Sequence, residues 1–523
     1  LDYAHGRFEA AESLGEHLLF GPAPADEAEA QRQARLERGR ALHDWVLGTK
    51  IEVYGADHPQ TGDARLYVAA YRKVQAGTAA EAEQARLLAE ALELTREATE
   101  TYRRKLGWAN ASSGFGLRSQ FYIHIDRGDR DAAFEVIQEA LAVELELVGE
   151  GHPRSLDVRE LFGRELLARQ EFEGAAEQLL TVWRGVEALD IDLRISPAWL
   201  HQSIGHAFIG LGLNLDALPH YRASVELARS ELADAPRGRM IVHENLAAAI
   251  LDTVEAEGED PPQETATDPA PLLADAEAAQ REAMAIVQAH ADDPEHGPRL
   301  LSLDPDDWAD EAARALATSR KLAAGHTKLA RIEVARGDLP KAIQECRRGI
   351  ELLEESDLAV ASFYARIAQI HVRADAIDEA IDAYERAAEL DEAHARLMFA
   401  ATRDQQIGLL ERERDNHAGH VAAYAHAYEL GLRHEAEAEP SKDPQERRDY
   451  ATNLVLLALN LGGTHVFNDD FELGIPYLIE ARDRLEALDP PDPGLRSQVL
   501  MLISMACEHL PERSRAKTKA CPS

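Results

Sequence analysis

YARIAQIHVRADAIDEAIDAYERAAELDEAH, residues 364–394, carries two apolar helix faces separated by a turn. Residues at three- and four-residue spacing line each face, which is the periodicity of an amphipathic helix. They are Tyr364, Ile367, Ala368 and His371 on the first helix, and Ala380, Tyr384 and Ala387 on the second. The stretch therefore predicts a helix, a turn near Asp375 and a second helix.

The same frame returns along the chain. Ala342 stands 38 residues before Ala380 in the same position of the preceding stretch. Further copies cover 121–140, 162–179, 204–224 and 461–481. The turn residues of these four copies are Gly128, Gln170, Gly212 and Asp469, and that of the stretch with Ala342 is Gly337. Small residues at positions 8 and 20 let two helices approach closely, and larger apolar side chains at positions 4, 11 and 24 fill the space between pairs. No pair buries its apolar face alone, so stability is shared along the stack.

The frame resembles the tetratricopeptide repeat family. The resemblance implies an all-α fold, a right-handed α-solenoid superhelix of antiparallel helix pairs. Two stretches, YGADHPQTGD (54–63) and VGEGHPRSLD (148–157), look like the longer subtype of kinesin light chains and many bacterial signalling proteins. The chain departs from the family at Glu354 and Glu392, where a proline usually closes the second helix.

These His-Pro stretches have three readings: a phosphate loop, part of a metal site, or a connector between helices. A middle copy, GWANASS (107–113), keeps the spacing of glycine and hydroxyl residue but has lost the histidine. A connector tolerates that loss more readily than a ligand site does. We expect glycine to end one helix, His-Pro to turn the chain, and Thr61, Ser113 or Ser155 to cap the next helix.

Composition excludes several classes of protein. Ninety-four acidic against 56 basic residues give a formal net charge of -38, which repels nucleic acid and anionic membrane surfaces. No apolar run reaches the roughly 18 to 20 residues that a membrane span needs. The three widely spaced cysteines, Cys346, Cys507 and Cys521, form no metal-ligand motif. We expect them to be reduced, which indicates a cytoplasmic protein.

The organisation expected from the sequence has five parts. Residues 1–54 form a partial repeat with an insertion, 55–258 a first repeat array, and 259–272 an acidic Pro/Thr-rich loop or linker, with the loop favoured. Residues 273–510 form a second array with a capping helix, and 511–523 a basic disordered tail. Because residues 1–14 match the end of one repeat helix and the next, we expect the natural protein to extend further N-terminally.

Motifs for catalysis are absent from the sequence. It has no phosphate-binding glycine loop, zincin, hydrolase-elbow or kinase motif, and we expect no enzyme activity in this chain and no cofactor. The strongest metal candidate is His417 and His420 with Tyr424, which share one helical face. No carboxylate completes a ligand set at suitable spacing, so ordinary helix packing is favoured and no metal site is predicted.

The resemblance implies that the first helices of the pairs line a concave groove. Their positions 2, 5, 6, 9 and 13 then face a ligand, and we predict a groove containing Arg118, Tyr122, Arg164, Trp199, Gln202, His206, Lys328, Arg331, Arg366, Gln369, Arg373 and Asn460. Several are basic although the chain is acidic. They suggest a basic stripe for a protein or peptide ligand with acidic side chains or a free C-terminal carboxylate. Pairing of these arginines with acidic neighbours is the structural alternative.

Two functions follow. The leading one is a non-catalytic scaffold that binds a protein or peptide in its concave groove. The alternative is the C-terminal sensor or regulatory region of a larger bacterial serine/threonine protein kinase, because arrays of this subtype follow such kinase domains.

Overall fold

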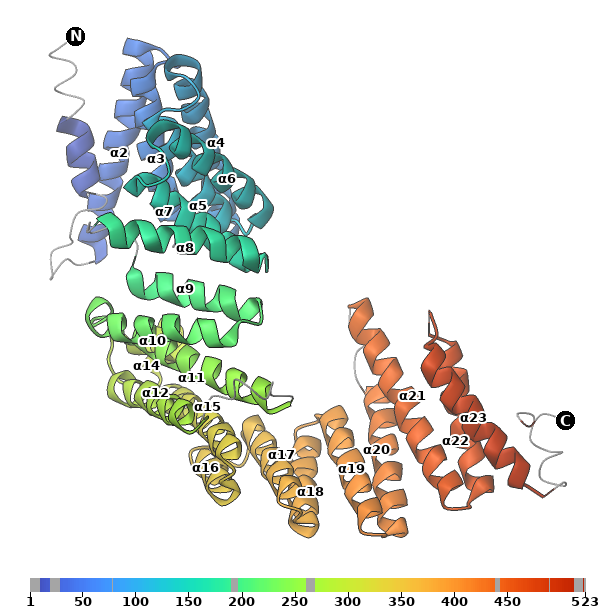
Figure 1. Ribbon diagram of the computed structural model, residues 1–523. Helices are drawn as coiled ribbons and strands as arrows, with labels where there is room; N and C mark the ends of the chain where they lie inside the picture. The colour runs from blue at the N-terminus through green and yellow to red at the C-terminus, as the bar shows by residue number, and fades with distance from the viewer. Residues whose placement is uncertain are drawn as a thin grey trace. The chain divides into compact units, whose positions relative to one another are not determined.

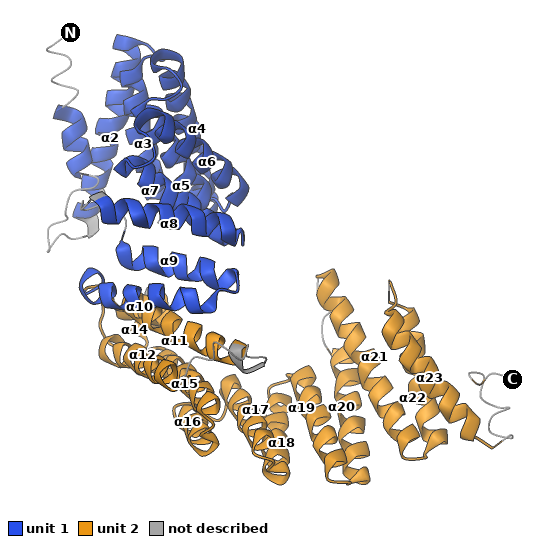
Figure 2. Cartoon of the chain, viewed as in Figure 1, with its two compact units in different colours: residues 1–233 blue, residues 234–523 orange. Residues whose placement is uncertain are grey.

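The computed structural model describes residues 10–18, 29–77, 79–189, 196–259, 269–437, 443–488, 490–511 and Cys521. Throughout these ranges the regular secondary structure is helical (Figure 1). The chain divides into two units, residues 1–233 and 234–523 (Figure 2). None of the helices in the described ranges has both the length and the apolarity that a bilayer span requires.

Unit 1 contains a helix over residues 10–18 and a series of helices that pack in consecutive pairs. The helices of this series are α2 (Glu29–Tyr54), α3 (Pro59–Ala76), α4 (Glu81–Leu106), α5 (Ala111–Asp126), α6 (Arg130–Val148), α7 (Pro153–Ala168), α8 (Phe172–Leu189), α9 (Pro197–Gly210) and α10 (Asn214–Glu231). The pairs are α3 with α4, α5 with α6, α7 with α8, and α9 with α10. Each pair also packs on the next, as in an α-solenoid.

Unit 2, taken by itself, is also built from consecutive helices that pack in pairs. Its helices are α11 (Pro236–Glu259), α12 (Pro269–His290), α13 (Gly297–Leu301), α14 (Pro305–Ala309), α15 (Glu311–Arg336), α16 (Leu339–Glu351), α17 (Leu358–Arg373), α18 (Ile377–Ala393), α19 (Leu397–Glu413), α20 (His417–Glu437), α21 (Pro444–Phe467), α22 (Phe471–Glu486) and α23 (Pro493–His509). Helices α11 and α12 pack against each other, so the acidic Pro/Thr-rich segment joins two helices of one pair. Residues 260–268 of that segment lie outside the described residues.

Close approach of the helices depends on small residues at position 8. A Cβ added at Gly163, Gly205 or Gly462 would lie 2.8 to 2.9 Å from side-chain atoms of Leu179, Tyr221 or Leu478 on the second helix of the pair. Ala368 and Ala380 play this part in the α17–α18 pair, where both are fully buried. The glycines and alanines are therefore the reason that the two helices of a pair pack at short range.

The turn residues that the repeat frame predicts within the described ranges adopt a left-handed conformation, whereas the turn expected at Gly6 lies outside these ranges. The φ values run from 57° to 80° at Gly128, Gln170, Gly212, Gly337, Asp375 and Asp469. This conformation is the one that glycine and short polar residues accept most readily. The sequence analysis of the turns is confirmed.

The His-Pro stretches are connectors, with one correction. Gly55 ends α2 at φ 87°, and Pro59 is the first residue of α3. The cap of α3 is His58, whose Nδ1 accepts a hydrogen bond from the backbone N–H of Gln60 at 3.2 Å. Thr61 was expected to be the cap, but its hydroxyl donates to the carbonyl of Gly55 at 2.8 Å. The Thr61 hydroxyl therefore binds the C-terminal end of α2, because His58 already caps the N-terminus of α3.

The middle connector shows how the histidine is replaced. Asn110 caps α5 by accepting from the backbone N–H of Ser113 at 2.8 Å, and its side-chain amide donates to the carbonyl of Gly107 at 2.7 Å. In the other copies the histidine caps the following helix and the hydroxyl residue donates to the glycine carbonyl. Asn110 alone makes both of these hydrogen bonds.

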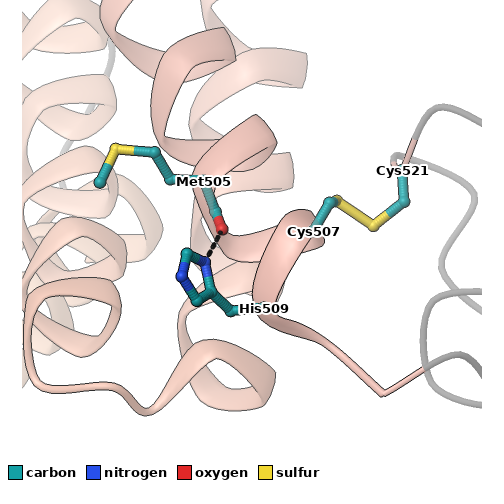
Figure 3. The surroundings of a disulfide bond; sticks show 4 residues. All are labelled: Met505, Cys507, His509 and Cys521. Atoms are coloured by element: carbon teal, nitrogen blue, oxygen red, sulfur yellow. Dashed lines mark hydrogen bonds between the residues drawn. A yellow bond between two sulfur atoms is a disulfide. The ribbon is translucent and has the colours of Figure 1, made fainter.

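The expected state of the cysteines is wrong for two of the three. Cys507 of α23 forms a disulfide with Cys521 (Figure 3), while Cys346 is free and buried. Disulfides persist mainly in oxidising compartments, so the argument for a cytoplasmic protein from reduced cysteines no longer holds. The basic residues expected in a disordered tail, 512–520, lie outside the described residues.

Candidate functional site: cavities along the first helices

The first helices α5, α7 and α9 of unit 1 line a cavity of about 760 Å³. Its lining includes four residues predicted for the groove, namely Arg118, Tyr122, Arg164 and Trp199. Three aromatic rings contribute: Phe115 is 51% exposed, Tyr122 is 45% exposed, and Trp199 is half-buried. The cavity thus offers rings with a large accessible area, which favour burial of an apolar or aromatic group of a ligand.

The charges of this cavity are balanced, which corrects the expectation of a continuous basic stripe. Two cations, Arg118 and Arg164, share the cavity with Asp157 and Glu160. Arg164 lies 3.5 Å from Glu160, one turn away on α7. Burial raises the pKa of Glu160, and the nearby Arg164 opposes that shift. Arg118 makes no ion pair with any described residue, so its guanidinium is available to a carboxylate.

Two groove residues predicted on α9 do not line the cavity. Gln202 is 1% exposed, and its side-chain amide donates to the hydroxyl of Ser224 at 3.1 Å. Its side chain lies inside the α9–α10 pair, so its expected place in the groove is wrong. His206 is exposed and packs edge-on against Tyr221 with ring centroids 5.5 Å apart. Although the ring reaches solvent, the protein atoms packed around it displace water, and this desolvation lowers the pKa of His206.

Unit 2 has a smaller cavity of about 300 Å³ between α11, α15 and α17. The predicted residues Arg331, Arg366, Gln369 and Arg373 line it together with Glu255. Arg331 donates to Glu255 at 2.8 Å and to Asp252 at 3.4 Å. This arginine is therefore paired with acidic neighbours, which was the alternative to ligand binding given by the sequence analysis. Arg366 and Arg373 have no ion pair among the described residues. The cavity therefore has a surplus of positive charge.

The remaining predicted residues lie outside these cavities. Lys328 of α15 is half-buried and lies 3.3 Å from Glu244, so it too is paired with an acidic neighbour. Asn460 is half-buried on α21. Arg366 also borders a neighbouring cavity of about 220 Å³ between α15 and α17, near Arg320.

Comparison with known families matches residues 361–394, the α17–α18 pair, to the tetratricopeptide repeat. The chain contains a tetratricopeptide repeat. The α7–α8, α9–α10, α19–α20 and α21–α22 pairs each have a small residue in close contact at position 8 and a left-handed turn residue, so the fold is a tetratricopeptide-type α-solenoid. No curated protein matches the chain in sequence.

Several solved structures are partly similar to this chain. They include the tetratricopeptide-like repeats of a putative kinesin light chain from Podosopora anserina, at 19% identity, covering 43% of this chain and 97% of that one with a TM-score of 0.32. BtubC from P. vanneervenii shows 17% identity, 53% and 92% coverage, and a TM-score of 0.34. The apo form of the quorum sensor NprR from B. thuringiensis shows 14% identity, 76% and 96% coverage, and a TM-score of 0.33.

The repeat frame also explains which lining residues the sequence analysis missed. Counting from the turn residues Gly128 and Gln170, Phe115 and Asp157 both stand at position 2 of their repeats. Position 2 was among the positions expected to face the groove, so the same rule applied to α5 and α7 would have found both. Ser196 lines the cavity as the cap of α9, one residue before the helix begins.

The histidines considered as metal ligands belong to a repeat that the sequence analysis did not recognise. Gly408, Asp415, His420 and Tyr424 stand at positions 8, 15, 20 and 24 of the α19–α20 pair. A Cβ on Gly408 would lie 2.8 Å from the ring of Tyr424, as in the other pairs. His420 is buried, with Nδ1 2.6 Å from the carbonyl of Gly408 and Nε2 3.2 Å from the hydroxyl of Thr464. Both ring nitrogens are thus used in helix packing.

Proposed function

We propose that this chain is a non-catalytic scaffold that binds an extended protein segment along the first helices of its repeats. The unit 1 cavity is the observation that carries the proposal. Its lining comes from the same repeat positions on successive first helices, as a ligand running across the repeats requires. The exposed rings supply contact area with little loss of side-chain entropy, and Arg118 supplies one unpaired cation.

We further propose that the ligand of unit 2 carries acidic side chains or a C-terminal carboxylate. Arg366 and Arg373 are seven residues apart, two turns along α17, and therefore lie on one helix face. A guanidinium binds a carboxylate through two parallel hydrogen bonds, which is stronger and more specific than a single contact. Arg331 is held by Glu255 at the edge of the same cavity. Because its charge is already paired, Arg331 contributes to the shape of the cavity but little to the binding of an acidic ligand.

Charge reversal tests the unit 2 site. The double variant Arg366→Glu/Arg373→Glu removes both unpaired cations, whereas Arg331 is left alone because reversing it would place three carboxylates together. The matched control is Arg184→Glu/Arg347→Glu, which makes the same change in net charge at exposed arginines on the second helices α8 and α16. Neither pair of substitutions removes an ion pair among the described residues, so thermal stability is expected to stay close to that of the parent.

The assay is fluorescence polarisation with a labelled library of acidic peptides, selected for binding to the parent. The groove variant is expected to weaken binding at least about tenfold per lost bidentate contact, since a charged hydrogen-bonded pair contributes on the order of 1.5 to 3 kcal/mol. The control variant should bind like the parent. Equal binding by both variants, or an equal loss in both, contradicts the proposal.

The kinase alternative concerns sequence upstream of this chain and stays a prediction. A glycine-rich loop followed by the HRD and DFG motifs in the upstream sequence would support it. Further helical repeats there would favour the scaffold alone.

A further inference from the structure

Unit 2 has a second cavity beside the one assigned to the acidic ligand. The first, the arginine cavity, is lined by Arg331, Arg366, Gln369 and Arg373 together with acidic and apolar neighbours. The second, the alanine cavity, has a volume of about 220 Å³, and its apolar lining consists of Ala323, Ala324, Ala359 and Phe363. Arg366 lines both cavities, so they adjoin at its side chain.

The alanine cavity suits an uncharged, apolar side chain. Arg320, which also lines it, donates from Nε to a carboxylate oxygen of Asp357 at 2.7 Å, so this charge is already paired. Thr327 and Ser362 contribute two hydroxyl groups. Apart from Arg366, the remaining lining consists of methyl groups and an aromatic ring. An apolar side chain that leaves water to pack against these groups gains free energy.

The two cavities follow each other along the gap between α15 and α17. On α17 the alanine cavity takes its lining from residues 359–366, and the arginine cavity from residues 366–373. On α15 the corresponding ranges are 320–327 and 331–335. The midpoints of these ranges are separated by about 7 residues on α17 and about 9.5 on α15, which is about 10 to 14 Å at 1.5 Å per residue.

An extended segment of a ligand matches this distance at one separation of its side chains. Side chains alternate between the two faces of an extended chain, which rises about 3.3 Å per residue. Two side chains that enter cavities in the same gap must point to the same face, so they are an even number of residues apart. A separation of two residues covers about 7 Å and one of four residues about 13 Å. A separation of four therefore fits the two cavities.

We infer that unit 2 recognises an extended peptide segment in which an acidic residue and a leucine-like apolar residue are four positions apart. The acidic side chain enters the arginine cavity, where Arg366 and Arg373 have no ion pair among the described residues. The apolar side chain enters the alanine cavity. This inference rests on the proposed acidic ligand of unit 2, and it adds the residue that distinguishes one acidic ligand from another.

Fluorescence polarisation of labelled peptides with the full chain tests the separation. Each peptide carries one glutamate and one leucine in a serine background, with the leucine two to five residues from the glutamate on either side. A reference peptide has the glutamate alone. On one of the two sides, the peptide with a separation of four should bind at least about tenfold more tightly than the reference, because a buried leucine side chain contributes at least that much.

Filling the alanine cavity tests where the leucine binds. Ala324 is exposed on α15 and lines this cavity, so Ala324→Phe should abolish the tenfold preference and leave binding of the reference peptide unchanged. Ala315→Phe is the control and should keep the preference, since Ala315 is also exposed on α15 but lines neither cavity. Equal binding at all separations, or a preference that survives Ala324→Phe, overturns the inference and leaves the acidic ligand of unit 2 standing. Failure of every glutamate peptide to bind overturns both.

Discussion

Close packing at Gly205 gives a prediction whose sign and size can be worked from the structure. Gly205 is in the middle of α9, and a Cβ there would lie 2.9 Å from two ring atoms of Tyr221, which is 2% exposed. In a helix interior, replacing glycine with alanine stabilises the helix by about 1 kcal/mol. Overpacking a rigid buried ring costs about 1 to 3 kcal/mol. With a mid-range cost of about 2 kcal/mol, Gly205→Ala should destabilise the α9–α10 pair by about 1 kcal/mol.

Gly48 provides the matched control. It is exposed inside α2, and no atom lies within 4 Å of a Cβ built there. Gly48→Ala should therefore keep the full gain of about 1 kcal/mol in helix propensity. The same substitution thus has opposite effects, and the two variants should differ by about 2 kcal/mol.

Native-state hydrogen exchange suits the comparison because it reads each helix pair separately, whereas long repeat arrays need not unfold in one transition. Amides of α9 and α10 should exchange faster in Gly205→Ala, and those of α2 more slowly in Gly48→Ala. Slower exchange of α9 and α10 in Gly205→Ala would refute the argument from close packing.

Three further predictions concern pH, a connector and the disulfide. Burial and the adjacent His220 lower the pKa of His201 to about 4, so the α9–α10 pair should be fully stabilised above the ordinary histidine pKa near 6.5 and lose stability as pH falls toward 4. His201→Phe should remove that part of the pH dependence in hydrogen exchange of α9 and α10. Ser155→Ala deletes the 2.6 Å hydrogen bond to the Gly149 carbonyl and should cost about 1 kcal/mol in urea unfolding, whereas an unchanged midpoint would contradict the role of the hydroxyl. Reducing Cys507–Cys521, which closes a loop with a sequence separation of 14, should destabilise α23 by about 3 kcal/mol, seen as faster amide exchange there and not in α17.

The fold could be predicted from the sequence because the backbone conformation restricts the residue type at certain repeat positions. The turn at position 15 needs a left-handed residue and position 8 needs a small one, and both requirements leave a mark on residue type. Gln170 was assigned to a turn from spacing alone, and its φ is 61°. The α19–α20 pair escaped recognition because His420 stands where a small residue is usual at position 20. Its turn at Asp415 keeps the spacing of the other repeats.

The details of the groove were harder to predict because they depend on which neighbours a side chain meets. Gln202 stands at a position expected to face the groove, yet it turns inward because Ser224 on α10 accepts its hydrogen bond. Arg331 and Arg366 both stand at repeat positions that were expected to face the groove, positions 9 and 6. The two differ because Glu255, 76 residues earlier, reaches Arg331. The disulfide was missed for a related reason, since spacing alone does not show that Cys521 returns to α23.

Binding along the first helices is the central claim, and site-specific photo-crosslinking tests it most directly. A benzophenone side chain is placed at Gln369, exposed on the first helix α17, and in a second variant at Arg347, exposed on the second helix α16. Each is irradiated with an acidic peptide selected for binding to the parent. Crosslinking at Gln369 and not at Arg347 is the predicted result; crosslinking at Arg347 without Gln369 would contradict the account.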